Sequence, residues 1–201
     1  MKLFCFPRSG NSREVKLVLA EKGVAYESIN THAEDFNQSD AEFRKASPVG
    51  EVPALIDDSS YLCDALDINL YLENKYTQKP LLPKEKNKQN EIVAWIKDYD
   101  KRLTIKIGLY IVECLLKPKE RQSEETKKTL LAGIQKGLKD ADTFLGNKDF
   151  FFGEYSLADI ALTPHVAALP RVNLGLTDEH PNLKRWLEKV KSRPNFTASM
   201  N

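Results

Sequence analysis

The stretch Gly50-Glu51-Val52-Pro53-Ala54-Leu55 decides the fold of the first part of this chain. Pro53 stands directly before an apolar run, Ala54-Leu55-Ile56, which ends at Asp57-Asp58. Because proline cannot donate to a strand ladder, it belongs at the first residue of a strand, at an edge or at a bulge. An X-Pro bond is also where a cis peptide costs little, about 0.5–1 kcal/mol. The step therefore predicts either a fixed kink that turns the backbone of Val52 toward a peptide-like ligand, or an ordinary turn before a strand.

Strands and helices alternate on both sides of this stretch. Hydrophobic periodicity predicts strands at residues 2–6, 26–30, 54–57 and 61–63, and helices at 14–22, 39–46 and 65–76. Ser39 and Glu42 have the spacing of a capping box, and Asp64 is expected to cap the third helix. The order is βαβαββα. A strand–helix–strand crossover is right-handed and joins parallel strands, so the first two strands should be parallel and the last two an antiparallel hairpin.

The second part of the chain is helical throughout. Lys79-Pro80-Leu81-Leu82-Pro83 indicates a linker, which predicts a first domain at residues 1–77, a linker at 78–86 and a second domain at 87–201. Helices are expected at 87–116, 123–145, 156–169 and 182–191, with a bend at Gly108. Ser156 and Asp159 have capping-box spacing. The expected architecture is a small α/β domain followed by an all-α domain.

Composition limits the partners and the compartment. The 201 residues carry 30 Lys and Arg against 29 Asp and Glu, a net charge of +1. Such a balance favours neither nucleic acid nor an anionic membrane as a partner. No apolar run approaches the roughly 18 residues of a membrane span, and the apolar start is too short for a signal peptide. The three cysteines form no pattern with metal-ligand spacing, so we expect a cytoplasmic protein without a metal.

Taken together, four segments resemble the cytosolic glutathione transferases of the serine-type classes, over essentially the whole length. They are Ser9–Leu17, Val52–Leu55, Phe152–Ala161 and Leu183–Phe196. The resemblance implies a thioredoxin-like first domain, a helical second domain, a homodimer, and glutathione as the co-substrate for a small electrophile. Phe6-Pro7-Arg8-Ser9 leans toward the zeta class, whose members isomerise maleylacetoacetate.

By this resemblance, Ser9 is the catalytic residue. A free thiol has a pKa near 8.5, so only a few per cent of it is thiolate at neutral pH. A hydroxyl that donates a hydrogen bond to the sulfur, together with the positive end of a helix, favours the thiolate. Two alternatives stay open. Ser9 could be a plain N-cap, and Ser12 could be the sulfur's partner.

The glutathione-binding residues follow from the same resemblance. Val52 would pair its backbone with the cysteinyl part of glutathione, and Pro53 would be the cis-proline. Asp64 and Ala65 lie where the family holds the γ-glutamyl carboxylate, but the family's serine hydroxyl is missing at Ala65. Glu51 stands where the family commonly has Gln or Lys near the ligand's carboxylates. These two departures predict weak binding, a different thiol ligand or a vestigial site.

The second-substrate pocket is expected between the loop that contains Phe6 and Arg8 and one face of the long helix. That face would carry Tyr99, Arg102, Lys106 and Tyr110. The alternative for the face is a core stripe with charges on its rim. Arg8 and Arg13 could meet a ligand carboxylate or be solvated surface charges. Cys5 is expected to face the sheet core, and His32 the surface.

Three functions compete at this point. The first is a glutathione transferase that stabilises the thiolate for attack on small electrophiles. The second is a non-catalytic protein of the same fold that binds a protein partner, as the stringent-starvation regulators do. The third is a zeta-like isomerase with glutathione as a true cofactor.

Overall fold

A mixed four-stranded sheet organises the first of two compact units. The computed structural model describes residues 1–31 and 41–197, so Ser39 and His32 lie outside the described residues. The first unit comprises residues 1–81 and the C-terminal residues from Pro194 on, and the second comprises Leu82–Arg193.

The strands of the sheet lie in the order β2-β1-β3-β4. They are β1 (Lys2–Cys5), β2 (Glu27–Asn30), β3 (Ala54–Asp57) and β4 (Ser60–Cys63). As the crossover rule predicts, β1 and β2 are parallel, and β3 and β4 form an antiparallel hairpin. The sheet is mixed because β1 pairs antiparallel with β3.

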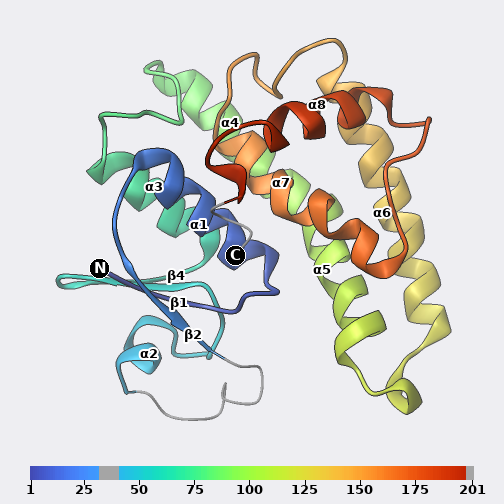
Figure 1. The fold of residues 1–201 in the computed structure, drawn as a ribbon, viewed down its shortest axis with the longest axis horizontal. Helices are drawn as coiled ribbons and strands as arrows, with labels where there is room; N and C mark the ends of the chain where they lie inside the picture. The colour runs from blue at the N-terminus through green and yellow to red at the C-terminus, as the bar shows by residue number, and fades with distance from the viewer. Residues whose placement is uncertain (32–40, 198–201) are drawn as a thin grey trace. The chain divides into compact units, whose positions relative to one another are not determined.

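The helices of the first unit are α1 (Gly10–Lys22), α2 (Ala41–Ala46) and α3 (Ala65–Lys75). In Figure 1, α1 and α3 pack together on one face of the sheet, and α2 lies on the other. Helix α1 starts four residues before the expected residue 14, because Ser9 already supplies its N-cap. It ends at Gly23, which has φ 69°, a left-handed conformation that glycine adopts at little cost.

Apolar side chains fill the space on both faces of the sheet. Leu3, Phe4 and Cys5 of β1 are at most 1 % exposed. A core cluster joins β1, α2 and β3; its members are Phe4, Phe43, Ala46 and Ala54, with Ile29, Val52 and Ile56 packed against it. The side chain of Val52 is therefore anchored in the core.

The second unit consists of helices. They are α4 (Lys86–Tyr99), α5 (Ile105–Ile111), α6 (Glu124–Leu145), α7 (Leu157–Ala168) and α8 (Pro181–Lys191) (Figure 1). The helix predicted at 87–116 is continuous but is not regular. Two π-helical segments, Asp100–Thr104 and Val112–Leu116, flank α5, whereas the predicted bend was placed at Gly108.

The segment after α3 is fastened to the first unit as far as Leu81. Lys22 Nζ forms a 2.6 Å ion pair with Glu73 and donates to the carbonyls of Tyr76 and Lys79. Glu73 in turn accepts the N–H of Leu81 at 2.9 Å. The chain end is also held: Asn195, which the sequence assigned to the helical domain, donates to Glu21 of α1. Among the described residues, none of the helices has the length and apolar character needed to cross a membrane.

Candidate functional site

The register of the sheet brings three loops to one end of the first unit. Phe4 pairs with Ala54, and Ala54 pairs with Cys63. The loop after β1, the segment before β3 and the start of α3 after β4 therefore all leave the sheet at the same end. The sequence predicted a ligand site from these three segments, and strand pairing brings them together.

The loop after β1 ends in the N-cap of α1. Ser9 donates its N–H to the carbonyl of Phe6 at 2.9 Å, and its Oγ accepts the N–H of Ser12 at 3.2 Å. The Ser9 hydroxyl acts as an acceptor in this bond, so its own hydrogen is left to donate to a ligand. Ser9 is thus an N-cap, and the cap leaves its donor capacity intact.

Ser12 differs from Ser9 in its surroundings. It is fully buried, and its Oγ accepts the N–H of Phe6 at 3.2 Å. Arg13 donates from Nε to the carbonyl of Pro7 at 2.9 Å, which closes the same loop. Arg8 is exposed and has no ion pair with another described residue. Ser12 is therefore closed to a ligand at the surface, whereas Arg8 is exposed and Ser9 and Arg13 are partly exposed.

The backbone of Val52 is unpaired although its side chain is anchored in the core. The Val52–Pro53 peptide bond is cis, as the sequence predicted. Across the described ranges, neither the N–H nor the C=O of Val52 is in a hydrogen bond. An unpaired backbone at the start of a strand is what an extended ligand needs in order to add to the sheet. Pro53 itself is buried.

Ser47 holds the segment before Val52 in place, and sequence reasoning missed it. It is fully buried, and its Oγ accepts the N–H of Glu51 at 2.7 Å and the thiol of Cys63 at 3.3 Å. The signal was present, since a serine followed by Pro48 after a helix is typical of a turn that uses its hydroxyl. The Glu51 side chain is exposed and forms no ion pair within the described part of the chain.

The start of α3 offers backbone donors. Asp64 caps the helix, with Oδ1 accepting the N–H of Asp67 at 3.1 Å. Its φ of 109° is sparsely populated for a non-glycine residue, and such conformations cluster at binding sites. The N–H groups of Ala65 and Leu66 are in the first turn, where no helical acceptor exists, so they are available to an anion. Ala65 is 5 % exposed and adds no hydroxyl.

The face of the long helix assigned to the second substrate lies along α6. Tyr99 is buried and stacks on Trp95 at 4.2 Å. Burial, the largest cause, and then the charge of Asp140 in α6 raise the pKa of Tyr99 to about 12. Lys106 lies against Gly133 of α6, where an added Cβ would come within 2.5 Å of its chain.

The other two residues of that face are partly open. Arg102 is exposed and pairs with Asp98 at 2.9 Å. Tyr110 is half-buried, and burial followed by the neighbouring Cys114 raises its pKa. The exposed apolar side chains of this helix lie elsewhere on it, at Ile105, Leu109, Val112, Leu115 and Leu116. Part of the predicted face is therefore core, and its role in a pocket stays a prediction.

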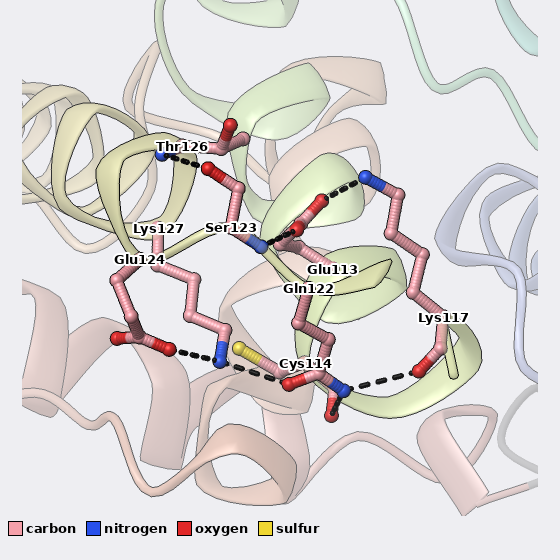
Figure 2. Close-up of polar contacts among 8 residues, drawn as sticks. All are labelled: Glu113, Cys114, Lys117, Gln122, Ser123, Glu124, Thr126 and Lys127. Carbon is pink, nitrogen blue, oxygen red and sulfur yellow. Dashed lines mark hydrogen bonds and ion pairs between the residues drawn. The ribbon is translucent and has the colours of Figure 1, made fainter. Parts of the chain in front are cut away.

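A polar network closes the turn between the second π-helical segment and α6. Figure 2 shows Glu113 accepting from Lys117 Nζ and from the N–H of Ser123, both at 2.6 Å, while Lys127 Nζ donates to Gln122 at 2.9 Å. The hydrogen bond from Lys117, followed by the Ser123 N–H, lowers the pKa of the buried Glu113 carboxyl. These contacts fix the turn and are structural.

No group of three or more His, Cys, Asp or Glu side chains in residues 1–31 and 41–197 is arranged to hold a metal ion. The candidate site therefore consists of a hydroxyl, an unpaired backbone step and a helix N-terminus. These features belong to a thioredoxin-like unit that is joined to a helical unit.

Comparison with known proteins gives the family. The family model described as "Glutathione S-transferase, N-terminal domain" matches residues 3–80, and "Glutathione S-transferase, C-terminal domain" matches residues 103–194. The chain belongs to the glutathione S-transferase family.

Individual relatives agree with this assignment. Glutathione S-transferase Z2 of Arabidopsis thaliana is 29% identical over 98% of this chain and 88% of its own length. A glutathione S-transferase of Triticum aestivum is 31% identical over 96% and 89%. Maleylacetoacetate isomerase of Pseudomonas aeruginosa is 27% identical over 98% and 93%. A glutathione transferase structure from Burkholderia graminis, with two glutathione molecules bound per subunit, superposes with a TM-score of 0.85 at 23% identity and covers 99% of this chain and 86% of that one.

Proposed function

We propose that this protein is a glutathione transferase that stabilises the thiolate of glutathione for attack on a small electrophile. The observation that carries the proposal is the unpaired backbone of Val52 at the same end of the sheet as Ser9 and the start of α3. The cysteinyl backbone of glutathione pairs with Val52 as a short added strand. The γ-glutamyl carboxylate lies at the N–H groups of Ala65 and Leu66.

Ser9 acts on the sulfur in this proposal. Its Oγ already accepts from Ser12, and its hydrogen donates to the glutathione sulfur. This bond, and the N-terminus of α1, stabilise the thiolate relative to the thiol and lower the thiol pKa. The thiolate then forms a carbon–sulfur bond with the electrophile, whose leaving group departs with the bonding electron pair.

A zeta-like isomerase is the second candidate, and the similarity to maleylacetoacetate isomerase favours it. In that reaction the thiolate adds to a conjugated double bond, rotation follows, and elimination returns glutathione unchanged. The two candidates share the site and differ in whether glutathione is consumed. We also propose that the protein is a cytoplasmic homodimer without a metal. Its three cysteines are free thiols, which are typical of a reducing compartment. Sedimentation equilibrium measures the subunit number.

Calorimetric titration with glutathione tests the proposal, and absence of binding at millimolar glutathione overturns both enzymatic functions in favour of a non-catalytic role.

A second experiment compares Ser9→Ala with Ser12→Ala. We expect Ser9→Ala to raise the pKa of the thiol of bound glutathione and to slow the conjugation of a chlorodinitrobenzene. The ultraviolet absorbance of the thiolate measures this pKa. Ser12→Ala should lower the free energy of unfolding while the thiol pKa is kept. The reverse pattern would show that Ser12, and not Ser9, donates the hydrogen bond to the glutathione sulfur.

A further inference from the structure

Ser47 lies in the turn between α2 and β3, directly after the last residue of α2. It is fully buried. Its N–H donates to the carbonyl of Phe43 at 2.7 Å, and its carbonyl accepts the N–H of Gly50 at 3.0 Å. The backbone of Ser47 is therefore fixed on both sides, and its hydroxyl is presented from a turn that is already closed.

The hydroxyl of Ser47 joins two separate segments of the first unit. Its Oγ accepts the N–H of Glu51 at 2.7 Å and the thiol of Cys63 at 3.3 Å. The Cys63 sulfur also lies 3.9 Å from the carbonyl oxygen of Glu51. Glu51 precedes Val52, and Cys63 precedes Asp64, the N-cap of α3. One side chain is thus bonded to the residue before each of two segments that the proposed function assigns to glutathione.

The strand ladder does not extend to these two segments. Among the described residues, the pairing of β3 with β4 ends where Ala54 lies opposite Cys63. The residues on the ligand side of this pair are outside the ladder, so their spacing depends on side chains. Val52 is anchored by its own side chain in the core. The hydroxyl of Ser47 supplies the link from this segment to the end of β4.

We propose that Ser47 is a positioning residue for glutathione, which holds the Val52 backbone and the start of α3 at the spacing that one ligand needs in order to bind both. This inference rests on the proposed function. Because Ser47 is fully buried, it acts through Glu51 and Cys63 and not by contact with the ligand. A ligand that spans two subsites gains from the second only where the geometry lets it engage both, and a preorganised site costs less to occupy.

The first test is calorimetric titration of the wild type and of Ser47→Ala with glutathione. We expect Ser47→Ala to weaken binding about ten-fold, because the Glu51 N–H and the Cys63 thiol both lose their acceptor. The pKa of the thiol of bound glutathione, measured by ultraviolet absorbance, should stay at its wild-type value, because Ser9 is held by a different contact, the N–H of Ser12. A change in affinity without a change in this pKa separates positioning from an effect on the sulfur.

Thr163→Val is the matched control for the loss of a buried hydroxyl. Thr163 is fully buried in α7, and its Oγ1 donates to the carbonyl of Asp159 at 2.6 Å. The substitution should lower the free energy of unfolding, measured by urea denaturation, and leave glutathione binding unchanged. Equal weakening of binding by Thr163→Val and Ser47→Ala would reflect general destabilisation and would overturn the positioning role.

Substitutions of the partly exposed Cys63 test the second hydrogen bond. Cys63→Ser keeps a donor for the Ser47 hydroxyl and should bind glutathione as tightly as the wild type. Cys63→Ala removes the donor and should weaken binding about three-fold, since a thiol is a weak donor. In the Ser47→Ala background, Cys63→Ala should have no further effect, because both substitutions break the same contact. Additive losses would contradict the link between the two segments.

The outcomes separate this inference from the proposed function. If the wild type does not bind glutathione at millimolar concentration, both are overturned. If the wild type binds and Ser47→Ala binds equally tightly, or changes the thiol pKa, only the role of Ser47 is overturned. If Ser47→Ala does not fold, the Cys63 variants decide, and equal affinities of Cys63→Ala and the wild type overturn the role.

Discussion

Trp186 of α8 donates its indole N–H to Oδ1 of Asp159 in α7 over 2.9 Å. The same carboxylate accepts the N–H of Phe151 at 3.1 Å and the N–H of Ser156 at 3.0 Å, and the last bond completes a capping box. Asp159 is fully buried. One carboxylate therefore ties together two helices and the loop that precedes them.

Asp159→Ala should lower the free energy of unfolding by at least about 2 kcal/mol. The substitution removes the acceptor and leaves the buried N–H groups of Trp186 and Phe151 without a partner, and each such donor costs about 1–3 kcal/mol. Urea denaturation followed by tryptophan fluorescence measures the change. Asp159→Asn keeps one acceptor oxygen and should cost less. An unchanged midpoint for Asp159→Ala would remove Asp159 from this structural role.

His165 of α7 should make the helical unit sensitive to acid. Burial lowers its pKa to about 4, whereas an unfolded histidine has a pKa of 6.5. Between these values the unfolded chain binds a proton that the folded chain does not, so stability falls as the pH falls, by about 1.4 kcal/mol per pH unit. Asp159 has the opposite effect on stability. Burial raises its pKa to about 6, so its contribution to the free energy of unfolding falls as the pH rises toward that value.

The contribution of His165 can be isolated by substitution. His165→Gln cannot titrate, so the difference in unfolding free energy between wild type and variant should change by about 3 kcal/mol from pH 7 to pH 4. Urea denaturation of both proteins at several pH values gives this difference. Parallel curves would mean that His165 is protonated alike in the folded and unfolded chains.

Glu51→Gln should tighten glutathione binding about three-fold. The Glu51 carboxylate is exposed, next to the Val52 backbone, and has no cation among the described residues to neutralise it. Removing a like charge near an anionic ligand removes a repulsion, which has the modest size that is typical of two solvent-exposed charges. The gain in affinity should therefore shrink as salt is added. Calorimetry at low and high salt measures both quantities. Glu27→Gln, exposed on β2, is the control and should have no effect.

Ala65→Ser should restore a hydroxyl at the start of α3 and tighten glutathione binding about ten-fold. A hydrogen bond to a charged group contributes about 1.5–3 kcal/mol, and the lower figure corresponds to about ten-fold in affinity. The γ-glutamyl carboxylate is the intended acceptor, so a glutathione analogue without this carboxylate should gain nothing. Equal gains for both ligands would place the γ-glutamyl group elsewhere.

The sequence predicted the first unit well because its cues are local. Pro53 before an apolar run, Ser9 and Asp64 at helix starts, and Gly23 after a helix each specify the backbone at their own position. The convergence of the three loops followed from strand order. Ser47 was missed although its bond to the Glu51 N–H is local, because its second partner, the Cys63 thiol, is 16 residues away in the sequence.

The long helix was predicted less well for a physical reason. A regular period of 3.6 residues was assumed from Tyr99 to Tyr110, but the π-helical segment Asp100–Thr104 lies between them. No composition signal marks a π-helical turn, which adds one residue without changing polarity. The face that spacing assigned to a pocket thus includes Tyr99, which lies in an aromatic core with Trp95.

The π-helical segment at Asp100–Thr104 also makes this part of the long helix tolerant of a change in length. A π-helical turn is equivalent to one extra residue in an α-helix, and each residue turns the helix by about 100°. Deleting one residue here would let a regular α-helix form, and the loss of the residue and the loss of the wide turn would cancel. Ile107 would stay buried and Leu109 would stay exposed. The same deletion within the regular helix α4 would instead rotate every later side chain by about 100° and take Ile107 out of the core. The wide turn therefore absorbs one residue and keeps the phase of α5.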